Sequence, residues 1–238
     1  MAGKRQIRME EMVLERGPTV DGVDDRTPVA WRDLRDWLKL VEQEGQLKRI
    51  TSPVDPDEEL AALTFMAGRT PETPALLFNN LVGNRTDARI LSNMLGASKE
   101  RYALAVGLDP DASTSELIMA DLMKHRLAPV QIPKHEAPVN EIVEQGSDVD
   151  ITSFPSPKFW PGDGGRYIGT GDITITRDPQ TGRINIGVYR QMVHGPARVG
   201  LYCSPGKHGR LDREAWWARG EPREVVAPAP QLGAFRKD

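Results

Sequence analysis

The spacing of hydrophobic residues changes once along this chain, on either side of a proline-rich segment, and this change limits the folds that the chain can adopt. Upstream, Leu34, Trp37, Leu38 and Val41 recur at the spacing of one apolar stripe on a helix. Downstream, between residues 167 and 176, apolar and polar residues alternate as they do in a half-buried strand. Two periods in two regions predict an α+β protein with separate helical and strand-rich parts.

The segment between the two regions, residues 128–162, contains six prolines. Proline fixes φ and removes a backbone donor, so we expect largely irregular, extended chain that crosses from one domain to the next. The charged residues 1–28 lack hydrophobic periodicity and predict a mobile extension. Helices and strands alternate over residues 29–127, which predicts an N-terminal α/β domain.

Within that domain the first helix should begin near Leu34 and end at Gly45, where glycine accepts a left-handed backbone. The second helix has a start signal, with Asp55 as N-cap, Pro56 at the first helical position and Glu58 at capping-box spacing. Its buried side should hold Leu60, Leu63 and Ala67. Further helices are predicted over 98–106 and 113–125, and strands over 47–50, 75–78 and 89–91.

Beyond the proline-rich segment we expect a β-meander that belongs to a barrel or an antiparallel sheet. Its strands are predicted over 167–176, 183–193 and 199–203, and residues 178–182 have the composition of a turn. The pair Trp216 and Trp217 predicts packing by a helix near the end of the chain.

The composition narrows the class of protein. A formal net charge of −3 argues against a clustered basic face, so we expect no nucleic-acid partner. No apolar run approaches the length of a membrane span, and the N-terminus has no signal-peptide core, so we expect no membrane association. A single cysteine, Cys203, suits a reducing cytoplasm.

The residues with the most chemical content follow the turn at 178–182. Asn185 offers an amide oxygen to a metal or a hydrogen bond to phosphate, and Arg190 offers a planar fork for phosphate or carboxylate. His208, after Gly206 and Lys207, offers a nitrogen ligand to a divalent metal. Amide, imidazole and carboxylate together suit Mn²⁺ or Mg²⁺ that bridges a phosphate.

Strand geometry leaves the convergence of these residues open. Asn185, Gly187 and Tyr189 share one face of the strand, whereas Arg190 has the parity of the opposite face. A bulge at Gly187 would bring Asn185 and Arg190 together, and without a bulge a ligand must wrap the strand end. By residue type alone, a turn or edge hydrogen bond is the more ordinary role for Asn185, and solvent exposure is the more ordinary role for His208. For Arg190 a solvated side chain and a ligand contact are equally ordinary.

Several short motifs follow one another along the chain: segments 33–38 and 45–50, the Val54-Asp-Pro triplet, Phe159-Trp-Pro with Gly165-Arg-Tyr-Ile, the Thr174-Ile-Thr-Arg-Asp-Pro run, and Asn185-x-Gly-x-Tyr-Arg-Gln-Met with His208 downstream. In this order, from about Trp31 to about Ala227, they resemble the UbiD family of reversible decarboxylases.

The resemblance implies a fold, cofactors and site residues. It implies an N-terminal α/β domain followed, over residues 163–238, by an incomplete split β-barrel of flavin-reductase-like type that binds prenylated FMN. A divalent metal, Mn²⁺ or Mg²⁺, with K⁺ nearby, would hold the cofactor phosphate. Asn185 and His208 correspond to metal ligands, and Arg190 to the arginine of a Glu-Arg-Glu catalytic network. Gly187, Val188 and Lys207 correspond to cofactor-lining positions.

The implied reaction is non-oxidative decarboxylation of an aromatic or α,β-unsaturated carboxylic acid, with a flavin prenyltransferase as cofactor supplier. Members of the family are about twice as long, and their third metal ligand and both network glutamates fall beyond residue 238 of this chain. We therefore expect either a decarboxylase, as a homo-oligomer or with a partner chain that supplies those glutamates, or a truncated remnant or accessory subunit that binds flavin phosphate and metal without turnover. A simple FMN-binding split-barrel module is a third interpretation, by fold analogy alone.

Overall fold

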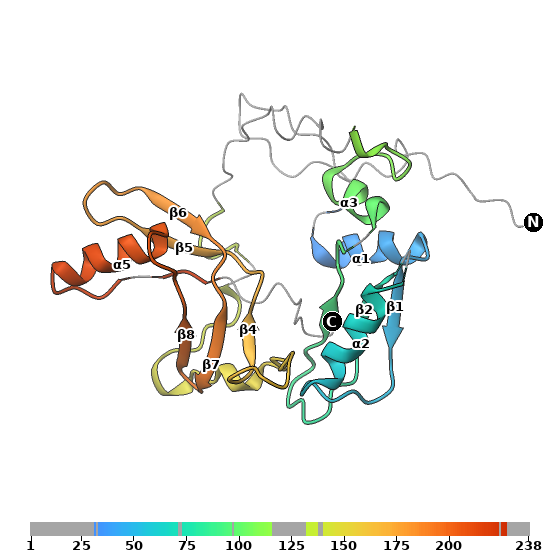
Figure 1. The fold of residues 1–238 in the computed structure, drawn as a ribbon, viewed down its shortest axis with the longest axis horizontal. Coiled ribbons are helices and arrows are strands. Elements are labelled where there is room, and N and C mark those ends of the chain that lie inside the picture. Colours follow the sequence, from blue (N-terminus) through green and yellow to red (C-terminus); the bar gives the residue numbers. More distant parts are fainter. Residues whose placement is uncertain are drawn as a thin grey trace, which may run out of the picture. The chain divides into compact units, whose positions relative to one another are not determined.

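The computed structural model describes residues 31, 33–70, 73–96, 98–115, 132–137, 140–223 and 225–227 (Figure 1). The predicted extension over residues 1–28 lies outside these residues, as does most of the helix predicted over 113–125. The described chain forms two compact units. One comprises residues 1–48, 68–75 and 93–143, and the other residues 49–67, 76–92 and 144–238. The domain boundaries predicted at 28, 127 and 162 stay a prediction.

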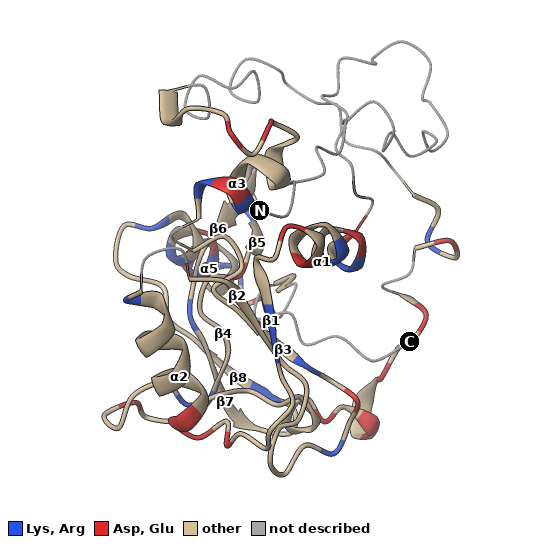
Figure 2. Ribbon diagram, turned by 90° about the vertical axis from the view of Figure 1, so that its right-hand side faces the viewer, with Lys and Arg blue, Asp and Glu red and all other residues tan. Residues whose placement is uncertain are grey.

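In the first unit, helices α1 (Leu34–Gln43) and α3 (Lys99–Val106) form where caps and periodicity agree. The Asp33 side chain accepts hydrogen bonds from the first-turn amides of α1, and Ser98 does the same for α3. Gly45 and Gly107 then take left-handed backbone at the two C-terminal ends, as predicted for Gly45. The apolar stripe of α1 is buried through Trp37, Leu38, Leu40 and Val41. As Figure 2 shows, basic and acidic residues are interspersed along α1.

A three-stranded sheet has the order β1 (Leu47–Ile50), β2 (Ala75–Phe78), β3 (Ile90–Ser92). Strands β2 and β3 are antiparallel, and both are buried along their whole length. Their side chains join a core with residues of the neighbouring helix α2 and of the loops: Val54, Leu60, Leu76, Phe78, Leu81 and Ile90.

Helix α2 spans Glu59–Gly68, so the predicted start at Asp55 and Pro56 was wrong by three residues. The reason is Glu58, whose φ of 68° lies in the left-handed region and excludes it from a helix. Glu59 instead reaches back, and its carboxylate accepts the backbone N–H of Asp55 at 2.7 Å. Leu60 is buried as predicted, but Leu63 is 38% exposed and does not join the core.

The Glu58 carboxylate compensates for this backbone conformation with a long-range contact. Lys158 Nζ lies 2.6 Å from Glu58 Oε1, and the backbone N–H of Glu58 donates to the carbonyl of Lys158 at 3.0 Å. The hydrogen bond to Glu58 raises the pKa of the Lys158 ammonium. The proline-rich segment is thereby attached to the start of α2. Its described part contains two short 3₁₀ turns, η4 (Gly146–Asp148) and η5 (Ile151–Ser153), and is otherwise irregular, as predicted.

The strand-rich part divides into two small antiparallel sheets, which corrects two predicted strands. The predicted strand 167–176 is β4 (Tyr167–Gly169) and β5 (Thr174–Arg177), and the predicted strand 183–193 is β6 (Ile184–Gly187) and β7 (Gln191–Gly195). One sheet has the order β4-β7-β8, with β8 at Arg198–Leu201, and the other pairs β5 with β6. Each predicted strand breaks because the chain leaves one sheet for the other in the middle of an alternating pattern.

The β5–β6 ribbon turns its polar face inward. Thr174, Thr176 and Asn185 are buried on one face, next to helix α5 (His208–Ala218), whereas Ile184 and Ile186 on the other face are 48% and 67% exposed. The pleat confirms the predicted alternation of residues 184–188, but the apolar side faces outward.

None of the helices in the described part of the chain has the length and apolar character of a membrane span.

Candidate functional site

A pocket of about 330 Å³ opens where the proline-rich segment meets β4 and the chain between β6 and β7. Three of its lining side chains are aromatic and two are charged. The lining consists of Phe159, Trp160, Asp163, Tyr167, Thr170 and Arg190. Aromatic walls with one cation and one carboxylate suit a flat, unsaturated ligand that carries an anionic group.

The aromatic wall is held by α2 and by its own turn. The ring of Trp160 packs edge-on against Phe65 of α2, with centroids 5.5 Å apart. The backbone N–H of Trp160 donates to the Asp163 carboxylate at 3.0 Å, and the Asp163 N–H donates back to the Trp160 carbonyl at 2.9 Å. Two residues earlier, Lys158 binds Glu58. The wall is therefore fixed at both ends.

Arg190 lies between two inward-facing neighbours. Tyr189 is 8% exposed and Gln191 is 2% exposed, while Arg190 itself is exposed and lines the pocket. Within the part of the chain that the structure describes, Arg190 makes no ion pair. Its guanidinium can bind a carboxylate or phosphate without first breaking another ion pair.

Sequence reasoning missed a buried carboxyl group that is hydrogen-bonded to Gln191, the residue after this arginine. Asp172 is fully buried between β4 and β5, where its Oδ2 accepts a hydrogen bond from Gln191 Nε2, and burial raises its pKa. A Cβ on Gly169 would come within 2.5 Å of Asp172 Oδ1, so only glycine leaves room for the carboxyl. In sequence, Asp172 falls inside the single strand predicted over 167–176, and nothing there marks it as buried.

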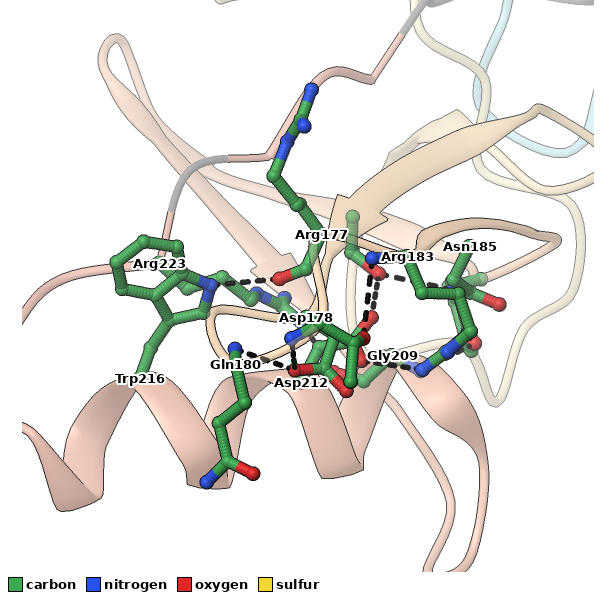
Figure 3. Close-up of polar contacts among 12 residues, drawn as sticks. Arg177, Asp178, Gln180, Arg183, Asn185, Gly209, Asp212, Trp216 and Arg223 are labelled. Carbon is green, nitrogen blue, oxygen red and sulfur yellow. Dashed lines mark hydrogen bonds and ion pairs between the residues drawn. The ribbon is translucent and has the colours of Figure 1, made fainter.

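Asn185 belongs to a buried polar chain on the inner face of β5–β6 (Figure 3). Its Nδ2 donates to Thr176 Oγ1 at 3.0 Å, and Thr176 donates to Asp212 Oδ2 at 2.5 Å. Arg183 Nη2 lies 2.9 Å from the other oxygen of Asp212, which is 1% exposed. Among the described residues, the bond to Thr176 is the one hydrogen bond of the Asn185 side chain, so the Asn185 amide oxygen is available to a ligand.

Lys207 and His208 stand at the N-terminus of α5. Lys207 is the N-cap, but its side chain makes no capping hydrogen bond, and His208 is the first helical residue. Both are exposed. The positive end of a helix dipole and two basic side chains at one place favour an anion.

The structure brings some predicted residues together and separates others. Asn185 is connected to α5 through Thr176 and Asp212, the latter one helical turn after His208. The β5–β6 register is regular from Ile184 to Gly187, without the bulge that would have turned Asn185 towards Arg190. Val188, 63% exposed, and Gly187 lie between them along the chain. A ligand that contacts both residues must therefore pass around the end of β6.

Asn185 and His208 carry donor types that metal sites use. Asn185 offers an amide oxygen and His208 an imidazole, a combination that suits Mn²⁺ or Mg²⁺ when carboxylates or phosphate complete the shell. Among the described residues there is no group of three or more His, Cys, Asp or Glu side chains placed to hold a metal. Further ligands must come from elsewhere.

Two sequence comparisons identify the class. Residues 38–120 match the N-terminal domain of 3-octaprenyl-4-hydroxybenzoate carboxy-lyase, and residues 130–229 match the Rift-related domain of the same enzyme. Together they cover most of the chain. The protein belongs to the UbiD family, as its motifs predicted.

Solved structures agree with this family. The vanillic acid decarboxylase ShVdcCD of Sedimentibacter hydroxybenzoicus, in its closed form, matches with a TM-score of 0.75 and 27% identity over 83% of this chain and 42% of that chain. An evolved dimeric form of the UbiD-class enzyme HmfF from Pelotomaculum thermopropionicum, in complex with prFMN, matches with 0.69 and 30% over 82% and 43%. The apo 3,4-dihydroxybenzoic acid decarboxylase AroY of Klebsiella pneumoniae matches with 0.72 and 29% over 83% and 42%. The chain thus spans less than half the length of each.

Proposed function

We propose that this chain supplies the flavin-binding part of a UbiD-type decarboxylase that acts on an aromatic or α,β-unsaturated carboxylic acid. The observation that carries the proposal is Arg190, an exposed guanidinium without an ion pair among the described residues, in a pocket walled by Phe159, Trp160 and Tyr167. An aromatic acid matches both the flat walls and the cation. The named activities of the similar structures support the same reaction class.

In this proposal Arg190 binds and orients the substrate carboxylate. The bond between the carboxylate carbon and its neighbour breaks, CO₂ leaves, and the electron pair stays on that neighbour. A carboxylic acid of the catalytic network then donates a proton to that carbon. The aromatic wall would stack against the substrate and fix its plane. Prenylated FMN, when bound, supplies the electron sink for the carbanion.

The cofactor phosphate would lie at the N-terminus of α5, where Lys207 and His208 meet the helix dipole. Asn185 and His208 would hold a divalent metal, Mn²⁺ or Mg²⁺, with K⁺ nearby, and Gly187 and Val188 would line the flavin. We propose that β4 to β8 form part of a split β-barrel. The same proposal includes a flavin prenyltransferase as the supplier of the cofactor, and a homo-oligomer or a further chain as the assembly. It also includes a cytoplasmic location.

The first test is co-expression of the chain with a flavin prenyltransferase, followed by an absorbance spectrum and metal analysis of the purified protein. The proposal expects bound flavin with about one manganese per chain, and quenching of Trp160 fluorescence by added benzoate. A colourless, metal-free protein would contradict it.

Two substitutions separate the roles of the site residues. Arg190→Ala should abolish decarboxylation in the complete enzyme and weaken benzoate binding while flavin stays bound. His208→Ala should lower the affinity for manganese about 10- to 100-fold, as loss of an interaction at a metal site does, and the purified protein should contain less flavin and manganese. Arg198→Ala, an exposed arginine on β8, is the matched control and should change neither quantity. Full flavin and metal content in the His208 variant would contradict its assignment as a ligand.

A further inference from the structure

Helix α5 begins without a side-chain acceptor from its own N-cap. The N-cap Lys207 makes no side-chain hydrogen bond to the helix. Its carbonyl accepts the amides of Arg210 at 2.9 Å and Leu211 at 3.1 Å, which leaves the amides of His208 and Gly209 outside this pattern.

A distant tyrosine supplies the missing acceptor for one of them. The backbone N–H of Gly209 donates to the hydroxyl oxygen of Tyr189 at 3.0 Å, and both residues are buried. The tyrosine thus acts as an N-cap from another element, where Ser, Thr, Asn or Asp would ordinarily act from within the chain.

Two glycines make this approach possible. A Cβ on Gly209 would meet the Tyr189 Cζ and hydroxyl at 2.8 Å, and a Cβ on Gly187 would overlap the same ring. The ring therefore fills a slot between the end of β6 and the start of α5. Any larger residue at either glycine would displace the tyrosine.

The contact joins two residues of the proposed site. Tyr189 immediately precedes Arg190, and Gly209 immediately follows His208. We propose that Tyr189 is a positioning residue whose hydroxyl caps α5 and so fixes the helix N-terminus, with His208, relative to Arg190. This inference rests on the proposed function, because the groups that it positions are the ligands assigned there.

The test compares Tyr189→Phe, which keeps the ring in its slot and removes only the hydroxyl, with Tyr202→Phe, an exposed control. Amide hydrogen exchange reads the cap directly. Loss of one buried hydrogen bond should make the Gly209 amide exchange about 5- to 10-fold faster in Tyr189→Phe. Protection of this amide in the wild-type protein tests the same contact without any substitution.

The second readout is binding of FMN in the presence of Mn²⁺, followed by flavin fluorescence. The apparent affinity should fall about 10-fold in Tyr189→Phe, as for other residues that orient a metal ligand, and stay unchanged in Tyr202→Phe. Unchanged affinity with faster Gly209 exchange would overturn the positioning role, and unchanged exchange would overturn the cap itself. A wild-type protein that binds neither FMN nor Mn²⁺ would refute the proposed function instead, while the exchange comparison would still decide whether Tyr189 caps α5.

Discussion

At the scale of single residues, the residues around the site include buried polar side chains that make only one or two hydrogen bonds among the described residues. Asp172 is the clearest case, because its carboxyl is fully buried and accepts a hydrogen bond from Gln191 through one oxygen, while the other oxygen has no partner among the described residues. Such a group costs free energy when it is ionised, since burial removes water without supplying a cation. The cost appears as a raised pKa.

This carboxyl predicts a pH dependence of stability with a definite sign. The folded state binds the proton more tightly than the unfolded chain, so stability should fall as pH rises from the ordinary value of 3.8 through the raised folded pKa. Asp172→Asn should remove this dependence and be at least as stable as wild type at neutral pH. Urea unfolding between pH 4 and 7.5 measures the difference.

Asp178 provides a control of opposite sign. Backbone hydrogen bonds from Gln180 and Thr181 lower its pKa, so its stabilising contribution should be present at neutral pH and disappear on acidification. The unfolding free energy of Asp178→Asn should therefore fall below that of wild type by the largest amount at neutral pH, and by less in acid. Parallel pH profiles for wild type and Asp172→Asn would contradict the account of Asp172.

At the scale of elements, polar contacts connect helix α5 to the β5–β6 ribbon (Figure 3). Asp212 accepts from Thr176 and pairs with Arg183, and Trp216 Nε1 donates to the Arg177 carbonyl at 2.8 Å. The attachment of α5 therefore relies on the buried carboxylate of Asp212, which is paired with one cation, Arg183.

This arrangement predicts unequal effects of the two partners. Arg183→Ala leaves the Asp212 charge buried without its cation and should cost about 2–3 kcal/mol of unfolding free energy. Asp212→Asn removes the charge, keeps a hydrogen-bond partner for Thr176 and leaves Arg183, already 40% exposed, in contact with water, so it should cost less. Chemical denaturation of both variants measures the order, and a larger loss for Asp212→Asn would contradict it.

At the scale of the whole molecule, buried and exposed surfaces are not divided simply by residue type. The ribbon buries Thr174, Thr176 and Asn185 and exposes Ile184 and Ile186, the reverse of an ordinary amphipathic sheet. Exposed apolar side chains that adjoin one another favour self-association.

Substitution of two isoleucines tests this distribution. Ile186→Thr, at 67% exposure, should change the unfolding free energy by less than about 0.5 kcal/mol and reduce self-association in light scattering. Ile168→Thr, at 7% exposure in β4, should cost about 1–3 kcal/mol, since it buries a hydroxyl and loses packing. Equal destabilisation by both would show that the outer face is buried in solution.

The sequence by itself determined the features that depend on neighbouring residues. The left-handed Gly45, the turn between β5 and β6 and the irregular proline-rich segment follow from local backbone preferences within a few residues. The motifs identified the family for the same reason, because they are short runs in a fixed order.

Only the tertiary structure decided where those pieces meet. It broke two predicted strands where the chain changes sheets, moved the start of α2 through the contact of Glu58 with Lys158, and joined Tyr189 to Gly209. It also turned the polar face of β5–β6 inward. The Tyr189–Gly209 and Glu58–Lys158 contacts join residues twenty and one hundred positions apart, so the local spacing of residues carries no signal of them.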